Sequence, residues 1–499
     1  MLTYAITTLG CKVNQYESAA LAATLGRAGL TEAPADTPAD LVVVNTCAVT
    51  RTAMRKARQA IRKAIRTHKP SAVLLTGCYA DYQGRTLGDI LDEAGIPPDR
   101  QAVVGHHGDL ATQLDQLLTR PEAAAQANNN RTANQANPSA DAAGNDESMK
   151  PEQIGSNRSA KTRRQGRSPQ SIRPNRMRAI KECAPGTDGL APLETFPSHQ
   201  RAFVKIQDGC DAFCAYCIVC YTRPRVRSRR PEDILAECAA LVAAGHREIV
   251  LCGVFLGAFG RSTAIRRRWT EPSDALAELV EQVASIPGLW RVRLSSLEPG
   301  DVTPRLLEVF AETPTVAPHL HLPLQSGSGR ILHRMNRQYT PGQFLHTVAE
   351  VRDRLDQPAI TTDIIAGFPG ETEDDFAATL AVARQSGFSK IHAFPFSAIE
   401  GTAAWTCRHD APSKDITRHR LDRLTELERE LALAYRRGFV GEQMEALVES
   451  TVTEAGLRVA MTDRYLPAAF PDENAQPGDI VPLRITAATP TGLTASYIG

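Results

Sequence analysis

The sequence predicts an α/β protein with three folded parts: an N-terminal open parallel α/β domain, a central incomplete (βα)6 barrel and a small C-terminal β-barrel. Three observations predict this organisation. A chain of 499 residues is too long for one core and suggests about three domains of ~100–200 residues each. Short apolar strands alternate with helical stretches in the first part and again in the centre, which is typical of parallel sheets. The final part, 436–499, reads as short strands broken by Gly, Pro and Asn.

Composition indicates a cytoplasmic, metal-using protein. The formal net charge is +1, so overall charge favours no particular partner. No stretch of about 18 apolar residues occurs, so we expect no membrane span. The first residues, MLTYAITTLGCKVNQ, contain neither a basic segment nor a long apolar one, so we expect no signal peptide. Eleven Cys in a chain that is not exported are more typical of metal binding or catalysis than of disulfides.

The N-terminal domain is expected over residues 1–118, with strands that alternate with helices. The expected elements, in order, are strand Tyr4–Leu9, a helix from about Gln15 to Ala28, strand Leu41–Val44, a basic helix near Arg51–Thr67, and strands Ala72–Leu75 and Ala102–Val104.

Three cysteines follow the first three of these strands. TLGC, NTC and TGC place Cys11, Cys47 and Cys78, here called the N-terminal triad, 36 and 31 residues apart. In open α/β sheets ligands bind at the carboxyl ends of the strands, so the three thiols can converge there. The alternative is three small buried hydrophobic residues, because free Cys is among the most buried residue types.

Residues 119–199 differ in composition and are expected to form a disordered insertion or linker. The segment is poor in apolar bulk and rich in Asn, Ala, Ser and Gln, so it cannot bury enough surface to fold. Its basic half, Arg158–Lys181, is either an arm attracted to phosphates or a solvated linker. Cys183 in its tail is interpreted as incidental.

The central part, residues 200–435, contains six strand–helix units. Six units rather than eight predict an incomplete barrel, whose chemistry is expected on the loops after the strands. The expected strands are Phe203–Gln207, Glu248–Leu251, Arg291–Ser295, His319–Leu324, Ala359–Ile365 and Lys390–Pro395. The expected helices are Pro231–Ala244, Ser273–Ser285, Thr303–Glu312, Thr340–Leu355 and Glu373–Ser386, with a further helix near Leu421–Phe439.

The loop after the first of these strands carries three cysteines at C-x3-C-x2-C spacing: Cys210, Cys214 and Cys217, here called the central triad. Cys thiolates are the usual ligands of iron–sulfur clusters, and a structural cluster takes four of them. A site with three protein ligands leaves one iron open, as metal sites that do chemistry require. The alternative is a structural zinc loop, which would need a fourth ligand.

Two runs of arginine follow. Five lie between Tyr221 and Arg230, and Arg266–Arg268 stand beside Trp269. The planar guanidinium suits phosphate oxygens, and arginine beside an aromatic ring suits unstacked bases. The alternative for each run is a solvated basic face.

The loop GCDAFCAYCI, followed by a Tyr and an Arg-rich tail, resembles the cluster loop of radical S-adenosylmethionine (SAM) enzymes and, within them, the methylthiotransferases. The likeness covers roughly residues 1–118 and 201–499. It implies that the central triad binds a [4Fe–4S] cluster that chelates SAM, and that the N-terminal triad binds a second [4Fe–4S] cluster that also leaves one iron free. The C-terminal part resembles the TRAM domain, a small RNA-binding β-barrel.

The resemblance implies that one electron cleaves SAM to a 5′-deoxyadenosyl radical, and that a C–H bond is replaced by C–S–CH3 with the cofactors doing the hard step. The family holds SAM at the strand-end edge, which makes five residues candidates for SAM contacts: Gly253, Ser295, Glu298, Gln325 and Ser328. On the residues alone these loops can also be plain turns. The resemblance assigns no side chain a catalytic role and names neither the electron donor nor the sulfur source.

The implied substrate is tRNA, in its anticodon stem-loop. TLGCKVNQYES looks most like the branch that acts on N6-threonylcarbamoyladenosine beside the anticodon. The isopentenyladenosine branch typically has a GCQMN-like start and is the alternative, whereas the branch acting on a ribosomal-protein aspartate has a GCPKN-like start. LHLPLQSGS fits the tRNA branches better. From a different class, the chain could be a non-catalytic RNA-binding protein with structural metal loops.

Cys220 departs from the family, which usually has Pro in a CIIPY-like text where this chain reads CIVCY. Four thiolates could close a cluster, and a closed cluster could not chelate SAM. The first three spacings match the SAM loop, and Cys220 starts the run toward Pro224, where the chain should already be leaving the cluster. We therefore predict that Cys220 is not a ligand.

Overall fold

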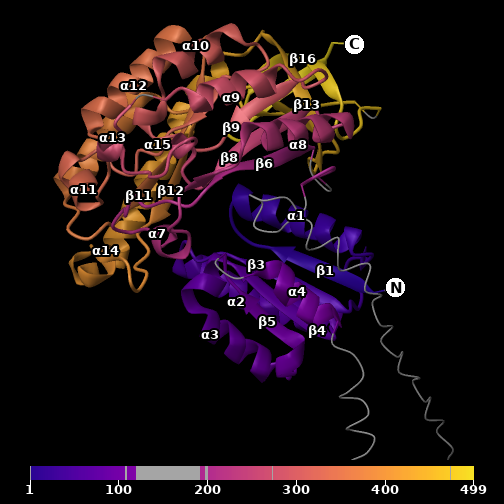
Figure 1. Cartoon of the computed structure of the whole chain (residues 1–499). Coiled ribbons are helices and arrows are strands. Elements are labelled where there is room, and N and C mark those ends of the chain that lie inside the picture. Colours follow the sequence, from indigo (N-terminus) through magenta and orange to yellow (C-terminus); the bar gives the residue numbers. More distant parts are fainter. Residues whose placement is uncertain are drawn as a thin grey trace, which may run out of the picture.

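The computed structural model describes residues 2–106, 109–119, 192–196, 200–271, 273–472 and 474–498. It has an N-terminal parallel sheet, a central set of parallel strands with helices outside them, and a closed C-terminal barrel (Figure 1). The predicted fold class is therefore confirmed. The predicted disordered insertion, with its basic half and Cys183, lies almost entirely outside the described residues, and the predicted domain boundaries stay predictions.

The N-terminal sheet has five parallel strands in the order β2-β1-β3-β4-β5. Its central strands are apolar and fully buried, since helices cover both faces, as parallel sheets require. The strands are β1 Thr3–Thr8, β2 Thr31–Glu32, β3 Leu41–Thr46, β4 Ala72–Gly77 and β5 Gln101–Val104. The helices are α1 Lys12–Arg27, α2 Arg51–His68, α3 Cys78–Glu93 and α4 Leu110–Thr119.

The central part contains six parallel strands, β6 and β8 to β12, in chain order around an open barrel. Bridges Val292–Val316 and Ser296–His321 link the first sheet to the second, and the short β7 pairs antiparallel with β6. The strands are β6 Arg201–Asp208, β7 Arg227–Ser228, β8 Glu248–Gly253, β9 Arg291–Leu294, β10 His319–His321, β11 Ala359–Ala366 and β12 Lys390–Pro395.

The helices of the central part mostly line the outside of these strands, whereas the short α7 lies against α3 of the N-terminal part (Figure 1). They are α7 Val219–Thr222, α8 Pro231–Ala243, α9 Ala275–Ala284, α10 Pro304–Glu312, α11 Gly329–Arg334, α12 Pro341–Arg354, α13 Glu373–Ser386, α14 Ala403–Thr406 and α15 Lys414–Arg437. Short 3-10 turns occupy Pro98–Arg100, Leu256–Ala258, Arg266–Arg268, Pro299–Asp301 and Arg408–Asp410.

The C-terminal strands close into a barrel in the order β13-β14-β15-β17-β16, with its own core around Phe470 and Leu483. The strands are β13 Gln443–Val452, β14 Arg458–Thr462, β15 Pro467–Phe470, β16 Ile480–Ala488 and β17 Leu493–Tyr497. Arg293 of β9 donates to the carbonyls of Thr462 and Asp463 at 2.7 and 2.6 Å, which fixes this barrel against the central one.

The N-terminal and central parts share one hydrophobic core. Tyr16, Leu21 and Leu25 of α1 belong to the same buried cluster as Val204 and Ile206 of β6.

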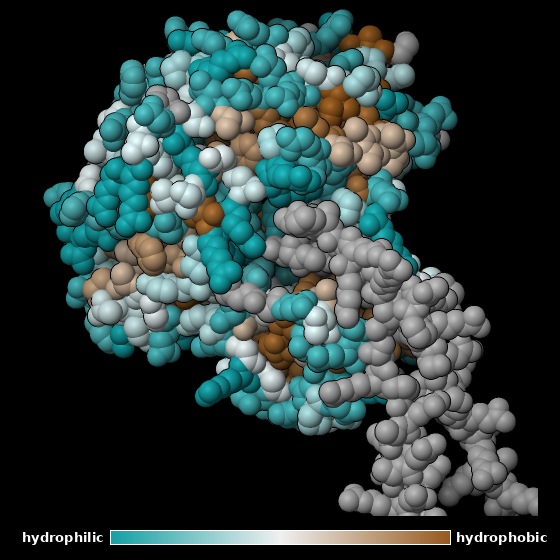
Figure 2. Space-filling view, viewed as in Figure 1, coloured by the Kyte–Doolittle hydropathy of each residue, from teal (hydrophilic) through white to brown (hydrophobic). Residues whose placement is uncertain are grey.

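The face in Figure 2 is mostly hydrophilic, with small hydrophobic groups between polar side chains. None of the described helices combines the length and the apolar character that a membrane crossing needs.

Several boundaries differ from expectation for local reasons. Helix α1 begins directly after Cys11 instead of near Gln15, and α15 begins at Lys414, where the hydroxyl of Ser413 accepts from the amide of Ile416 at 3.3 Å. Strand β10 ends at His321 because Pro323 has no N–H to continue the ladder. Helices α3, α4, α7, α11 and α14 were not predicted.

Candidate functional site

The N-terminal triad lies at the carboxyl edge of the N-terminal sheet. Cys11 stands between β1 and α1, Cys47 directly follows β3, and Cys78 is the first residue of α3 after β4. Cys47 and Cys78 are each 5% exposed, whereas Cys11 is exposed. Burial, with a smaller effect of the Cys78 and Cys11 thiols, raises the pKa of Cys47 to about 12. The three thiols are therefore close enough to interact electrostatically, as their equivalent positions predict.

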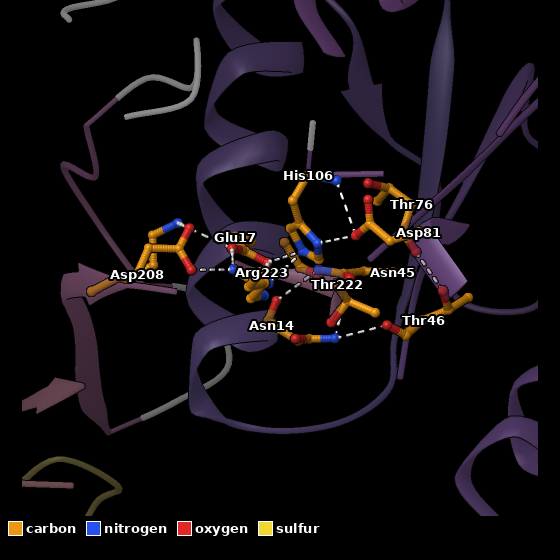
Figure 3. Close-up of polar contacts among 12 residues, drawn as sticks. Asn14, Glu17, Asn45, Thr46, Thr76, Asp81, His106, Asp208, Thr222 and Arg223 are labelled. Carbon is orange, nitrogen blue, oxygen red and sulfur yellow. Dashed lines mark hydrogen bonds and ion pairs between the residues drawn. The ribbon is translucent and has the colours of Figure 1, made fainter. Parts of the chain in front are cut away.

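Glycine and asparagine let the three loops approach one another. Gly10 has a φ of +114°, and a Cβ there would stand 3.3 Å from the Cys47 sulfur. Gly77 has a φ of +93°, and a Cβ there would meet the Thr46 carbonyl oxygen at 2.3 Å. The Asn14 side chain donates to the carbonyls of Leu9 and Thr46 at 2.9 and 3.1 Å, so it joins the first loop to the second (Figure 3).

The central triad forms a compact loop with donors directed at its sulfurs. The amide of Ala212 donates to Cys210 Sγ, and that of Val219 donates to Cys217 Sγ, both at 3.4 Å. The Arg337 guanidinium donates to Cys214 Sγ at 3.1 Å. Hydrogen bonds of this kind stabilise negative charge on thiolate ligands and tune cluster potentials.

Burial raises the pKa of the Cys210 thiol and raises that of Cys217 to about 12, with a further contribution from Cys214. A ligand thiolate at these positions thus needs a bound cation to compensate its charge. In the described ranges, no three His, Cys, Asp or Glu side chains are grouped so as to hold a single metal ion. The thiolates of an iron–sulfur cluster bind different iron atoms. The donor chemistry of both triads fits such clusters, and their role as ligands stays a prediction.

Six ionisable side chains, here called the buried ion cluster, join the two triads: Glu17, Asp81, His106, Lys205, Asp208 and Arg223. Figure 3 labels all of them except Lys205. Arg223 contacts Glu17 through both Nη atoms at 2.7 and 2.8 Å and Asp208 at 2.7 Å. Lys205 donates to Glu17 at 3.0 Å. The Arg223 carbonyl accepts from the Cys210 amide at 2.9 Å, so the cluster connects directly to the central triad loop.

The buried ion cluster pairs the carboxyl groups of Glu17, Asp81 and Asp208 with the basic side chains of Arg223, Lys205 and His106. Desolvation opposes ionisation of Glu17, but Arg223 and Lys205 hold its pKa well below the usual range. Burial and the Arg223 charge tend to lower the pKa of His106, but its hydrogen bonds to Asp81 and Glu17 raise it to about 9.

The five predicted SAM contacts occupy different environments. Gly253 ends β8, where a Cβ would meet the Gln207 side chain at 3.0 Å. Ser295 directly follows β9, and its hydroxyl is buried without a hydrogen-bond partner among the described residues. Gln325 is 8% exposed with a φ of +60°.

The side chains of Glu298 and Ser328 form ion pairs and hydrogen bonds with other residues of the protein. The Glu298 carboxylate lies between Arg266 and Arg337, with Arg337 at 2.5 Å. The Ser328 hydroxyl caps α11 and donates to Asp375 at 2.6 Å. Glu298 therefore positions Arg337, and through it the Cys214 sulfur, whereas Ser328 fixes the start of α11.

The first arginine run is partly structural. Arg223 and Arg229 are buried, and Arg229 pairs with Glu237 at 2.5 Å, whereas Arg225 and Arg230 are exposed. The thiol of Cys220 donates to the Cys217 carbonyl at 3.4 Å inside the short helix α7. That Cys220 lies outside the ligand set stays a prediction.

Sequence reasoning missed Arg337 and Lys12. Arg337 lies in the run HRMNRQYT, where nothing local distinguishes it from a surface arginine. Lys12 directly follows Cys11, and sequence reasoning singled out only the cysteine; in the structure Lys12 lines a cavity. A charged residue directly after a candidate ligand was the available signal.

Two family models match the chain: the uncharacterized protein family UPF0004 over residues 3–96 and the radical SAM superfamily over residues 204–383. A threonylcarbamoyladenosine tRNA methylthiotransferase of Bacillus subtilis is 31% identical over 496 residues, which cover 98% of this chain and 94% of that protein. A tRNA-2-methylthio-N(6)-dimethylallyladenosine synthase of Acidothermus cellulolyticus is 34% identical over 510 residues, 99% of this chain and 88% of that protein. Among solved structures, a radical S-adenosylmethionine methyltransferase from Kitasatospora setae is similar with a TM-score of 0.45 and 12% identity, over 81% of this chain and 74% of that one.

Proposed function

The chain belongs to the radical SAM tRNA methylthiotransferases, and we propose that its substrate is N6-threonylcarbamoyladenosine beside the tRNA anticodon. The reaction replaces the C–H bond at C2 of the adenine by C–S–CH3. The observation that carries this proposal is the pair of cysteine triads, each with interacting thiols and the two joined by the buried ion cluster. Relatives named for threonylcarbamoyladenosine span nearly the whole chain, and the start TLGCKVNQYES, which resembles that branch, supports the choice of substrate.

We infer that the central triad holds one [4Fe–4S] cluster and the N-terminal triad a second. When bound, these clusters and SAM supply the radical that breaks an unactivated C–H bond and the sulfur that replaces it. The protein's own residues position these groups. Arg337 and the amides of Ala212 and Val219 donate toward the central sulfurs, while the buried ion cluster fixes the distance between the two loops.

The proposal extends to the remaining parts of the chain. The C-terminal barrel is the RNA-binding, TRAM-like domain over 436–499, and it contacts the anticodon stem-loop together with the exposed arginines Arg225 and Arg230. Residues 1–118 and 200–435 form the two cofactor-binding domains, and 119–199 the linker between them. The protein acts where tRNA is modified, in the cytoplasm.

A second candidate function is methylthiolation of N6-isopentenyladenosine. A relative named for the dimethylallyl compound is 34% identical over 99% of this chain, so overall similarity favours neither substrate. A non-catalytic RNA-binding protein with structural metal loops is the third, from a different class.

Anaerobic reconstitution with two substrates tests these candidates. The protein is loaded with iron and sulfide and given SAM, a reductant and one of two anticodon stem-loops, which carry threonylcarbamoyl or isopentenyl on the same adenosine. We expect about eight iron atoms per chain, four for each cluster, and methylthio product from the threonylcarbamoyl RNA. Product only from the isopentenyl RNA would move the chain to the second candidate. Bound zinc without SAM cleavage would make it a binding protein.

A further inference from the structure

A cavity of about 320 Å³ lies where all three parts of the chain meet. Its walls come from the inner face of strands β8 to β12, from the C-terminal barrel at Tyr465 and Leu466, and from Lys12 at the start of α1. Lys12 directly follows Cys11 of the N-terminal triad, and Ser295 of the same wall stands at the strand-end edge where SAM contacts are predicted. The cavity therefore reaches the residue that follows Cys11 and one of the residues predicted to contact SAM.

The lining of this cavity is basic. Its residues include Lys12, Arg293, Lys390 and Arg436 together with His319, His321 and His392, and the described lining residues include no Asp or Glu. Burial, together with the positive charges of Arg293 and Lys12, holds the pKa of His319 well below its usual range. His319 is therefore a neutral imidazole in a positive field, and such a field favours an anionic guest.

Some of these cations are already committed. Arg293 pairs with Glu248 at 2.7 Å, and Lys390 pairs with Glu428 at 2.9 Å. Arg436 donates to the carbonyls of Thr489 and Pro490 at 3.3 and 2.9 Å, and His321 lies 3.3 Å from Asp363. Lys12, by contrast, has neither an ion pair nor a hydrogen bond among the residues that the structure describes. One ammonium is thus available to a ligand.

Two buried polar groups in the same wall also lack partners. His319 is 8% exposed, and its Nδ1 has no hydrogen-bond partner in the described part of the chain. Its ring is held by stacking on Tyr465 with centroids 5.1 Å apart and by a 3.3 Å contact between Nε2 and Thr361. The hydroxyl of Ser295 is equally unpartnered. Leaving buried polar groups unpaired is costly, which is expected of a site that a ligand completes.

We propose that this cavity binds the carboxylate of the threonylcarbamoyl group of the substrate, through the Lys12 ammonium and hydrogen bonds from His319 and Ser295. The inference rests on the proposed function and names the part of the substrate that the site recognises. The isopentenyl group is apolar and would leave all three groups unpaired. A site built to hydrogen-bond a substrate group discriminates strongly against an analogue that lacks it.

Two other anions share this chemistry, the carboxylate of SAM and the phosphates of RNA, so the test separates them. Binding to the cluster-loaded full chain is measured for three stem-loops of one sequence, bearing threonylcarbamoyladenosine, its methyl ester or unmodified adenosine. The phosphates are identical in all three. SAM affinity is measured in parallel without RNA.

We expect the wild type to prefer the threonylcarbamoyl stem-loop to its methyl ester, and Lys12→Gln to reduce that preference about tenfold or more. Lys12→Arg should retain most of it. Lys56→Gln, at an exposed lysine of α2, is the matched control and should leave the preference unchanged. His319→Phe, which keeps a ring against Tyr465 and removes the nitrogens, should reduce the preference even if Lys12→Gln fails to bind iron.

The outcomes are distinct. If the wild type prefers the threonylcarbamoyl RNA, and Lys12→Gln and His319→Phe keep the same preference as the wild type, the inference is overturned and the proposed function stands. If Lys12→Gln weakens SAM affinity and leaves the RNA preference intact, the carboxylate bound here belongs to SAM. If it weakens all three RNAs alike, the ligand is phosphate. A wild type that binds all three RNAs equally overturns the proposed function along with the inference.

Discussion

Replacing Glu17 by Gln tests whether the buried ion cluster holds the N-terminal and central parts together. Glu17 comes from α1, and its carboxylate accepts from Arg223 at 2.7 and 2.8 Å and from Lys205 at 3.0 Å. The substitution keeps the shape but removes a carboxylate from two buried cations, Arg223 and Lys205. The Coulomb attraction between two unit charges 3 Å apart is about 5 kcal/mol at an effective dielectric constant of about 20. Asp208 still faces Arg223 and Lys205, so we expect a net loss of about 3–5 kcal/mol, the usual cost of breaking a buried pair.

Urea denaturation followed by circular dichroism measures this loss. Glu93→Gln is the matched control, because Glu93 makes a 3.1 Å ion pair with Arg62 in the same domain but is 66% exposed; it should change stability little. The double variant Glu17→Gln/Arg223→Met should cost less than the sum of the single variants, since the two side chains are in contact. A loss for Glu17→Gln as small as that of the control would refute the reasoning.

Four further predictions follow from the same features. Replacing the central triad by Ala should abolish reductive SAM cleavage, whereas replacing the N-terminal triad should leave cleavage and abolish methylthiolation; methylthio product from the second variant would contradict the sulfur-carrying role. Cys220→Pro should keep the iron content and SAM cleavage, and iron loss together with a wild type that cannot cleave SAM would show a closed cluster. Deleting Gln126–Met177 should preserve folding and iron, with at most weaker and more salt-sensitive tRNA binding; unfolding would reveal a structured element. Folding raises the pKa of His106 from 6.5 to about 9. The contribution of protonated His106 to the free energy of unfolding is therefore complete below pH 6.5 and is lost as the pH rises through 9. Urea midpoints should therefore fall over that range, and His106→Gln should flatten the fall.

Most of the fold was predictable because its signals are local. Apolar runs such as Leu41–Thr46 identify buried parallel strands, and the count of six units in the centre predicts an open barrel. The cysteines could be placed at equivalent strand ends for the same reason. The comparisons then confirm the resemblance on which the enzymatic class was based.

The buried ion cluster could not be predicted, because its contacts are distant in sequence. Arg223 and Glu17 are 206 residues apart, and Arg229 meets Tyr16 across a similar separation. In the sequence these arginines belong to a basic run that looks solvated or directed at phosphate. Only the docking of α1 on β6 brings the Glu17 carboxylate to Arg223 and the Tyr16 hydroxyl to Arg229.

Lys12 illustrates the same limit at the site. Its motif identifies the neighbouring Cys11, but its environment is built by β9, β10 and the C-terminal barrel, all more than 250 residues away. For Glu298 the sequence predicted a binding role, but the contacts of its side chain could not be predicted. It was predicted at the SAM edge, and its carboxylate is engaged by Arg266 and Arg337.

The nucleosides of tRNA from a strain that lacks this protein test the central claim most directly. Mass spectrometry of the digested tRNA should show loss of the methylthio mark from threonylcarbamoyladenosine alone, with the unmodified threonylcarbamoyladenosine accumulating and 2-methylthio-isopentenyladenosine unchanged. Reintroducing the gene should restore the mark. A strain that retains 2-methylthio-threonylcarbamoyladenosine and loses the isopentenyl compound would contradict the account.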